Sequence, residues 1–234
     1  MKLNDIQFFY INCKKDHFKN NLILSQWEKC CEYADNNIKI NRWDAVHFED
    51  YNLFYFLNSY GVSGGKIDGQ PSNVAVWKSH TNLWKYILHK KYKYAFIFED
   101  DVTIPKSFLK DLEEILYDTP DNWDTLHFGI LRMMAKKSNS GQFHKMLPRK
   151  GYNNGLHAYM VNSNSVKKML ATVLELGASN QIDIMLRDNA DNFNFFIYEK
   201  LLIKQNVDNL ESTRLGRFVK PELKQNFDEI NIVV

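Results

Sequence analysis

Three consecutive carboxylates, Glu99, Asp100 and Asp101, are the residues of this chain best suited to chemistry, because they directly follow an apolar run at residues 94–98. A continuous apolar run is typical of a buried strand in an α/β sheet. In such sheets, ligands bind just beyond the carboxyl ends of the strands. Three acids at that point repel one another unless a cation lies among them, and carboxylate oxygens suit Mg²⁺ or Mn²⁺. The pattern predicts either a metal site that handles phosphates or a solvated turn whose acids cap the next helix.

The composition of the chain is that of a globular protein and excludes several other classes. The chain has 234 residues, with 44% hydrophobic and 14% aromatic content, which is enough for the core of one large domain. A net charge of +2 gives no argument for nucleic acid or an anionic membrane as a partner. Cys13, Cys30 and Cys31 lack the spacing of a disulfide framework or a zinc site. We therefore expect a soluble protein of the cytoplasm or another reducing compartment, without a membrane span.

Apolar residues along the chain alternate between strand and helix periodicity, which predicts an α/β fold with a mostly parallel central sheet. We expect strands at residues 6–11, 38–40, 95–98, 123–129, 156–161, 193–198 and 201–204. We expect helices at residues 17–33, 51–60, 74–89, 105–117, 163–176 and 182–189, with Pro105 opening the fourth and Ser163 capping the fifth. A glycine-rich loop at residues 62–73 precedes the third helix.

Two basic stretches have little periodicity. The first covers residues 132–154, and the second is the C-terminal tail, residues 212–234. A loop as long as the first is usually functional or mobile in a compact domain, so it is either a lid over an anionic ligand or a solvated surface loop. The tail either closes over a diphosphate or is a solvated terminus. We expect the whole chain, residues 1–234, to form a single domain.

Several short motifs occur in a fixed order along the chain. They are Phe9–Lys15, Arg42–Val46, Ser79-His80, Phe98–Val102, Trp123-Asp124 with Gly129, Ala158-Tyr159 before Ser163, Ile182-Asp183 and Lys204-Gln205. As an ordered set, these motifs resemble glycosyltransferase family 25, over about residues 6–213. That family includes bacterial lipooligosaccharide galactosyltransferases and collagen hydroxylysine galactosyltransferases.

The resemblance implies one Rossmann-like domain of the A-type glycosyltransferase fold, a nucleotide-sugar donor, a divalent cation and inversion at the anomeric carbon. It makes the acidic triplet a DxD-like motif with Asp101 as the metal ligand. Glu99 and Asp100 then contact the donor ribose, a water near the metal or the metal itself. The cation stabilises the charge that develops on the departing diphosphate. No His follows His157, so a further metal ligand is Asp208, Gln205 or water.

Inversion requires a base that takes the proton of the acceptor hydroxyl, and the resemblance gives this role to Asp183. The alternative for Asp183 is an acid that the dipole favours at the start of a helix. Asp124 is the second candidate for the base, or else an acid that satisfies backbone donors.

The remaining candidates for nucleotide-sugar binding are Asn12, Lys15, Arg42, Ser79, His80 and Gln205. Each also has a structural alternative. His80 lies on the apolar face of its helix, where a histidine is more often a hydrogen-bonded core residue, and it either contacts the donor sugar or braces the acidic loop. Lys15 meets phosphate or lies at the surface. Arg42 contacts the base or closes a structural ion pair.

The sequence departs from the family pattern at three places. Residues 73–76 read Asn-Val-Ala-Val where the family has Gly and Glu with a Gly-Cys pair. Lys19 stands where the family has a second Arg, and His47 and Phe48 replace a Gly. These departures leave the fold prediction unchanged but keep the identities of donor and acceptor open.

The function predicted is a metal-dependent, inverting transfer of a hexose, galactose or glucose, from a UDP-sugar with Mn²⁺ or Mg²⁺. The acceptor is a glycan or a hydroxylysine on a collagen-like protein; a homodimer is left open, and we expect no nucleic-acid partner. One alternative is a catalytically silent relative that binds a nucleotide-sugar or stabilises a partner enzyme. Another is a metal-dependent phosphohydrolase that uses the same acids.

Overall fold

The structure, a computed structural model, describes residues 1–47, 49, 71–139, 141–176, 180–206 and 230–233. Its strands are β1 (Ile6–Asn12), β2 (Ile40–Asp44), β3 (Tyr94–Glu99), β4 (Val102–Thr103), β5 (Thr125–Leu131), β6 (Met133–Lys136), β7 (Phe143–Met146), β8 (Asn154–Asn162), β9 (Phe195–Tyr198), β10 (Lys204–Gln205) and β11 (Ile230–Val233). Its α-helices are α1 (His17–Ala34), α3 (Pro71–Lys90), α4 (Phe108–Ile115), α5 (Ser163–Leu176) and α6 (Ile182–Asp188). Short 3₁₀ turns η1 (Leu3–Asp5), η2 (Leu116–Asp118) and η3 (Ala190–Asn192) complete the set.

Nine of the described strands form one sheet in the order β11-β6-β7-β9-β5-β8-β3-β1-β2. The pairing of neighbouring strands makes β7 and β8 run against the other seven. The α/β class predicted from the sequence is confirmed, with a sheet that is mixed in pairing although most strands share one direction. A second sheet consists of β4 and β10 alone.

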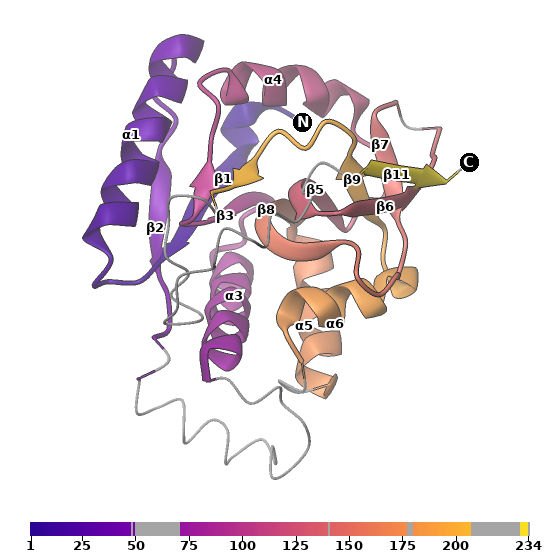
Figure 1. Cartoon of the computed structure of the whole chain (residues 1–234). Helices are drawn as coiled ribbons and strands as arrows, with labels where there is room; N and C mark the ends of the chain where they lie inside the picture. Colours follow the sequence, from indigo (N-terminus) through magenta and orange to yellow (C-terminus); the bar gives the residue numbers. More distant parts are fainter. Residues whose placement is uncertain (48, 50–70, 140, 177–179, 207–229, 234) are drawn as a thin grey trace, which may run out of the picture.

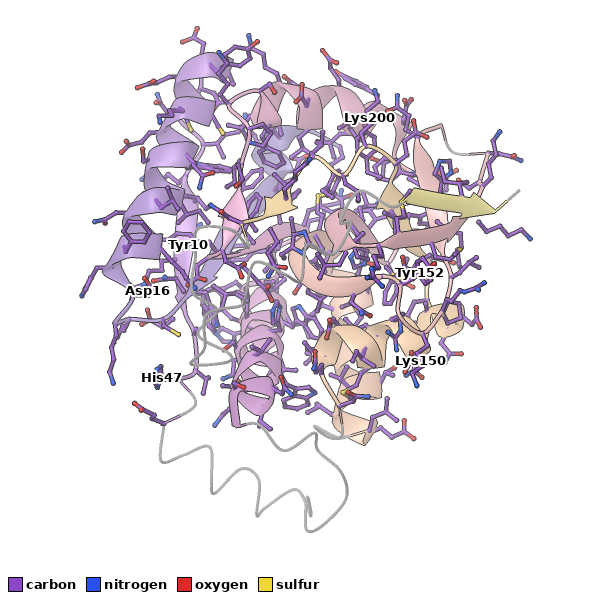
Figure 2. The ribbon with its side chains drawn as sticks, viewed as in Figure 1. Tyr10, Asp16, His47, Lys150, Tyr152 and Lys200 are labelled. Carbon is purple, nitrogen blue, oxygen red and sulfur yellow. The ribbon has the colours of Figure 1, made fainter. Side chains whose placement is uncertain are left out.

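Helices cover both faces of the large sheet, with α1 and α4 on one face and α3, α5 and α6 on the other (Figure 1). Alternate residues of each strand point to opposite faces. In β3, Phe96 and Phe98 pack toward α1 and α4, whereas Ile97 packs toward α3. Side chains fill the space between the sheet and both helical layers (Figure 2). All four residues 95–98 are buried, which explains the continuous apolar run in the sequence.

Local side-chain bonds set the starts of two helices. Asp16 caps α1, because its Oδ1 accepts the backbone N–H of Lys19 at 3.0 Å. The cap of α5 is Asn162, whose Oδ1 accepts the backbone N–H of Ser165 at 2.9 Å. The predicted cap, Ser163, is instead the first helical residue, so that prediction was off by one position.

Three further predictions need correction. The segment 132–154, expected as a loop, contains β6 and β7, two four-residue strands too short to give a clear period. The second strand lies at Ile40–Asp44 and not at residues 38–40. Of the strand expected at residues 201–204, only Lys204 lies in a strand, β10 (Lys204–Gln205), which pairs with β4. The predicted helix 51–60, most of the loop 62–73 and nearly all of the tail 212–234 lie outside the described residues.

The fold brings several strand ends to one edge. β1, β2 and β3 are parallel neighbours, so their carboxyl ends meet there. β8 is antiparallel to β3 and β5, so its first residues lie at the same edge. Within the described part of the chain, every helix is too short or too polar to cross a membrane.

Candidate active site

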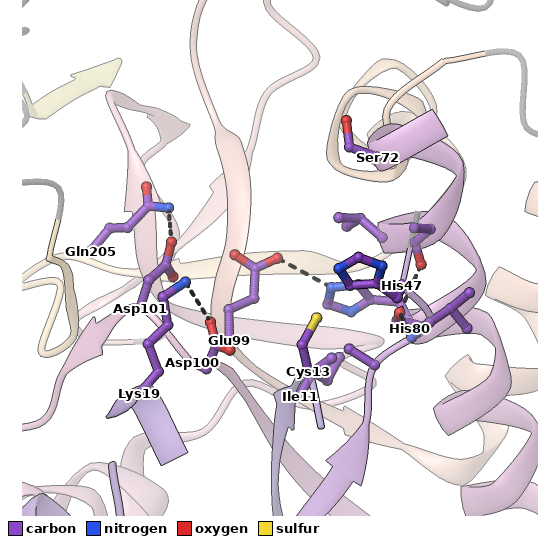
Figure 3. A pocket seen from close by; sticks show the side chains of 15 residues that line it. Ile11, Cys13, Lys19, His47, Ser72, His80, Glu99, Asp100, Asp101 and Gln205 are labelled. Atoms are coloured by element: carbon purple, nitrogen blue, oxygen red, sulfur yellow. Dashed lines mark hydrogen bonds and ion pairs between the residues drawn. The ribbon is translucent and has the colours of Figure 1, made fainter. Parts of the chain in front are cut away.

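A pocket opens where β1 and β3 end, between these strand ends, the first turns of α3 and the strand β10 (Figure 3). Its cavity volume is about 150 Å³. Its walls are Ile11, Cys13, Lys19, Ala45, Val46, His47, Ser72, Ala75, Val76, Ser79, His80, Glu99, Asp100, Asp101 and Gln205. The acidic triplet therefore lies at a pocket and not in bulk solvent.

The three acids have different surroundings although they are consecutive in the chain. Asp100 is turned toward Asn12 and Lys19. Its Oδ2 accepts the Asn12 Nδ2 amide at 2.8 Å, and its Oδ1 lies 3.4 Å from the Lys19 ammonium. Burial raises the pKa of Asp100, while the charge of Lys19 and the Asn12 bond oppose that shift. Asp100 is thus engaged by the protein itself.

Lys19 supplies a positive charge inside the site, although it was not among the site residues predicted from the sequence. Its side chain is only 5% exposed and pairs with Asp16 and Asp100. Burial lowers the pKa of the Lys19 amine, but Asp100, Asp101 and Asp16 outweigh burial, so the net pKa is raised. The ammonium lines the pocket, where it can meet an anionic group. The sequence did contain one indication of this role, because Lys19 stands where the family pattern has a second Arg.

Asp101 has only part of its hydrogen-bonding capacity satisfied. Gln205 Nε2 donates to its Oδ2 at 2.9 Å, and the backbone N–H of Asn206 donates to its carbonyl oxygen at 2.6 Å. Its Oδ1 is buried and has no hydrogen-bond partner. Burial, followed by the charge of Glu99, raises the pKa of Asp101 to about 7. A carboxylate in this state is stabilised by any cation that reaches Oδ1.

Glu99 faces the α3 side of the sheet and bonds to His80. Glu99 Oε1 lies 3.2 Å from His80 Nε2, and His80 Nδ1 lies 2.9 Å from the hydroxyl of Tyr159 (Figure 3 shows the first contact). His80 is 1% exposed and still lines the pocket. The histidine thus braces the acidic loop, which was one of the two roles left open for it.

The donor atoms around Asp101 fit a hard divalent cation that has few protein ligands. Asp101 Oδ1 is a buried oxygen without a partner, and Glu99 lines the same pocket. Among the described residues, no three His, Cys, Asp or Glu side chains are grouped as a ligand set. Mg²⁺ is commonly bound by one or two carboxylates, with water and substrate phosphates in the other positions. Asp208, the other predicted ligand, lies outside the described residues.

The wall opposite the acids comes from α3 and the chain after β2. Ser79 joins the two, because its hydroxyl donates to the Ala75 carbonyl at 2.7 Å and accepts the Val46 N–H at 2.9 Å. Val46, Ala75 and Val76 give this wall an apolar surface. His47 lies on the same wall and contacts Glu49 at 3.5 Å. Periodicity could not show that these residues line a pocket.

Three predicted donor-binding residues, Asn12, Lys15 and Arg42, lie outside the pocket lining. Arg42 forms an ion pair with Asp44 at 2.6 Å near the surface. Lys15 lies 3.7 Å from Glu49, and both side chains are mostly exposed. Asn12 is buried beneath the triplet and reaches it only through Asp100. The other residues predicted to bind the donor, Ser79, His80, Glu99, Asp100 and Gln205, line the pocket.

Asp183, the predicted base, is the second residue of α6 and is not part of the pocket lining. Its Oδ2 accepts the backbone N–H of Gly155 at 2.7 Å, and its Oδ1 is buried without a partner. Gly155 has a φ of +90°, a conformation that glycine adopts without strain. Because Gly155 lies in the first residues of β8, Asp183 is held at the same edge of the sheet as the triplet.

Asp124, the second candidate for the base, lies at the opposite edge. It precedes β5, which runs in the same direction as β3. Its Oδ2 accepts the Asn194 N–H at 2.8 Å and pairs with Lys168 at 3.2 Å. Asp124 therefore satisfies a backbone donor, the structural alternative that the sequence left open.

In layered α/β folds, ligands bind in a crevice just beyond the carboxyl ends of the strands, and this pocket with its acids lies there. Residues 72–186, just under half of the chain, match the model of glycosyltransferase family 25 (LPS biosynthesis protein). This segment contains the Ser79-His80 pair, the acidic triplet and Asp183. The resemblance seen in the sequence is thereby confirmed, and it supports a glycosyltransferase function.

Solved structures that align with this chain include two transferases. One is a glycosyltransferase involved in the glycosylation of the major capsid of PBCV-1, with 11% identity, 71% of this chain and 65% of that chain covered, and a TM-score of 0.35. This chain thus spans less than two thirds of that protein. Another is mouse xyloside xylosyltransferase 1 in its apo form, with 11% identity, coverage of 82% and 84%, and a TM-score of 0.44. A protein from STIV has 10% identity, coverage of 84% and 81%, and a TM-score of 0.37. No curated protein matches the chain.

Proposed function

We propose that this protein is a metal-dependent, inverting glycosyltransferase that moves galactose or glucose from a UDP-sugar to a hydroxyl of a glycan or a hydroxylysine-type acceptor. One observation carries the proposal: Asp101 has a buried, unpartnered oxygen in a pocket that also holds Glu99 and Lys19. This pocket lies at the strand edge where ligands bind in α/β folds. The family match over residues 72–186 supports the same reaction class.

Asp101 and Glu99 are the residues that would hold Mn²⁺ or Mg²⁺. Bound there, the cation would supply electrostatic stabilisation of the charge that develops on the departing diphosphate. Lys19 adds a fixed positive charge close to the acids, and Gln205 keeps Asp101 in place. Asp100 holds Lys19 in position, because it is the ammonium's nearest carboxylate.

Asp183 is the base in this proposal. The Gly155 N–H fixes one carboxylate oxygen, and the other has no partner, so it is available for the proton of an acceptor hydroxyl. Its place at the same edge of the sheet as the pocket suits an acceptor that approaches the donor from the α6 side. Nothing in the described residues distinguishes galactose from glucose, so both donors belong in the experiment.

A specific observation also favours a second candidate, a catalytically silent relative that binds a nucleotide-sugar. Residues 73–76 depart from the family pattern, and two of them, Ala75 and Val76, line the pocket. A changed wall can retain donor binding while it removes the geometry needed for transfer.

The test is UDP release from UDP-galactose and UDP-glucose with Mn²⁺, measured with and without a panel of glycan and hydroxylysine acceptors. Acceptor-dependent release, lost on addition of EDTA and restored by Mn²⁺, is expected. Donor binding without release would support the silent relative instead. Hydrolysis of simple phosphate esters would point to a phosphohydrolase built on the same acids.

A further inference from the structure

A line of hydrogen bonds runs from the core between the sheet and α3 to the acidic triplet. Trp84 Nε1 lies 2.9 Å from the Tyr159 hydroxyl oxygen, and that oxygen lies 2.9 Å from His80 Nδ1. His80 Nε2 then lies 3.2 Å from Glu99 Oε1. Trp84 and Tyr159 are fully buried, and His80 is 1% exposed, so water does not compete for the two bonds of the Tyr159 hydroxyl.

The donors and acceptors in this line can be assigned from chemistry. An indole N–H only donates, so the Tyr159 oxygen accepts from Trp84. Burial raises the pKa of Tyr159 well above its ordinary value, so the hydroxyl keeps its proton. That proton has His80 Nδ1 as its acceptor among the described residues. A neutral imidazole that accepts at Nδ1 carries its proton on Nε2, the nitrogen that faces Glu99.

The tautomer of His80 has a consequence for the three acids. A neutral His80 with its proton on Nε2 donates to Glu99 and holds that carboxylate on the α3 side of the pocket. Asp100 is drawn the other way by Asn12 and Lys19. Glu99 and Asp101 line the same pocket, and Asp101 Oδ1 is buried without a hydrogen-bond partner. Glu99 and Asp101 are therefore the two acids left to share one cation.

We infer that His80 is a positioning residue, fixed as the Nε2–H tautomer by Trp84 and Tyr159, and that this buried line sets the affinity of the Glu99–Asp101 pair for a divalent cation. The cation part of the inference rests on the proposed function, whereas the tautomer does not. Hydrogen bonds behind metal-binding side chains commonly change metal affinity by about 10- to 100-fold.

The first experiment is nitrogen NMR of the imidazole rings in the metal-free protein, with the His80 signals assigned by their loss in His80→Gln. We expect one bare nitrogen and one N–H, with the proton on Nε2. A proton on Nδ1, or on both nitrogens, would overturn the inference. This result does not depend on whether the protein transfers a sugar.

The second experiment is titration of the protein with Mn²⁺ alone, followed by electron paramagnetic resonance. Tyr159→Phe keeps the ring but removes the hydroxyl, and we expect its dissociation constant for Mn²⁺ to rise by about 10-fold. The matched control is Tyr198→Phe, which removes another buried tyrosine hydroxyl, bonded to Gln142 at 2.6 Å on the opposite face of the sheet. The control should bind Mn²⁺ as the wild type does.

Two His80 variants separate the loss of the hydrogen bond to Glu99 from a general loss of folding. His80→Gln retains an amide donor for Glu99 and should keep Mn²⁺ binding closer to the wild type than His80→Leu, with thermal unfolding measured for both. Equal Mn²⁺ affinity in wild type, Tyr159→Phe and His80→Leu would overturn the inference. A wild-type protein that binds no Mn²⁺ would overturn the proposed cation and its control by this line, while the NMR result would still decide the tautomer.

Discussion

Asp101 follows the carboxyl end of β3, whereas Asp124 precedes the amino end of β5, so the two acids lie at opposite ends of strands that run in the same direction. Their carboxylates differ in how fully they are hydrogen-bonded. Asp124 accepts a backbone N–H from Asn194 and pairs with Lys168, so folding itself satisfies its carboxylate. Asp101 receives one amide from Gln205 and keeps a buried oxygen without a partner. Burying an ionised carboxylate is costly unless it is paired. The comparison teaches that an acid left unsatisfied by the fold is a better sign of a site than an acid in a suggestive motif.

The largest expected effect is that of Asp101→Asn. The variant keeps an acceptor for Gln205 but removes the charge that would bind the cation, so we expect turnover to fall to background. Because the wild-type carboxylate is buried without a cation, we also expect the metal-free variant to unfold at a higher temperature than the wild type. UDP release and thermal unfolding in EDTA measure the two effects. Normal turnover would remove Asp101 from the site.

Asp183→Asn sharpens the comparison at a second acid that has an unpartnered oxygen. The amide still accepts from Gly155 but cannot take a proton, so we expect transfer to fall by about 10²- to 10⁴-fold. Donor binding should be unchanged, because Asp183 does not line the pocket. The measurement is acceptor-dependent transfer beside UDP-sugar affinity. If donor affinity fell as much as transfer, Asp183 would be a structural residue and not the base.

Asp124→Ala is the matched variant at the opposite edge. It leaves the Asn194 N–H without its acceptor, so we expect a loss of about 1–3 kcal/mol in the free energy of unfolding. Turnover per folded molecule should equal that of the wild type. Denaturant unfolding and UDP release at a temperature where both proteins are folded give the two numbers. Loss of turnover without loss of stability would show that Asp124 belongs to the active site and is not a structural acid.

The smallest effect at neutral pH is expected for His127→Gln. Burial, followed by the charge of His157, lowers the pKa of His127 to about 3. The unfolded chain takes up a proton near its ordinary pKa of about 6.5 while the folded protein does not, so His127 makes stability fall as the pH drops below that value. His127→Gln should unfold with a weaker pH dependence between about pH 6.5 and 4, by thermal melts across that range. An unchanged slope would contradict a buried, neutral His127.

The sequence predicted the half of the sheet whose strands have a clear pattern. β1, β3, β8 and their helices were predicted because long apolar runs and a 3.6-residue period leave little ambiguity. β6 and β7 were missed because four-residue strands that contain Lys136, His144 and Lys145 look polar in isolation. They are strands because neighbouring strands pair with them, which a local pattern does not contain.

The acids of the candidate site were predictable, as were Asn12, His80 and Gln205, which bond to them, but Lys19 was not. A strand that ends in three carboxylates is visible in the sequence, whereas the burial of Lys19 follows from the placement of α1 against the triplet. Lys15 was selected because it follows the first strand directly, yet it points to the surface and contacts Glu49. Helix α1 begins at His17, between these two lysines, so Lys15 precedes the helix whereas Lys19 lies in its first turn and is buried.

The pairing of β10 with β4 has a consequence for how the protein is made. Gln205 and Asp101 are bonded across 104 positions of the chain. During synthesis on a ribosome the acidic loop emerges long before Gln205 has been added, so a nascent chain carries Asp101 without its amide partner. Contacts of such wide separation form late in folding, and we expect the carboxylates to gain their final geometry only in the last stage of maturation.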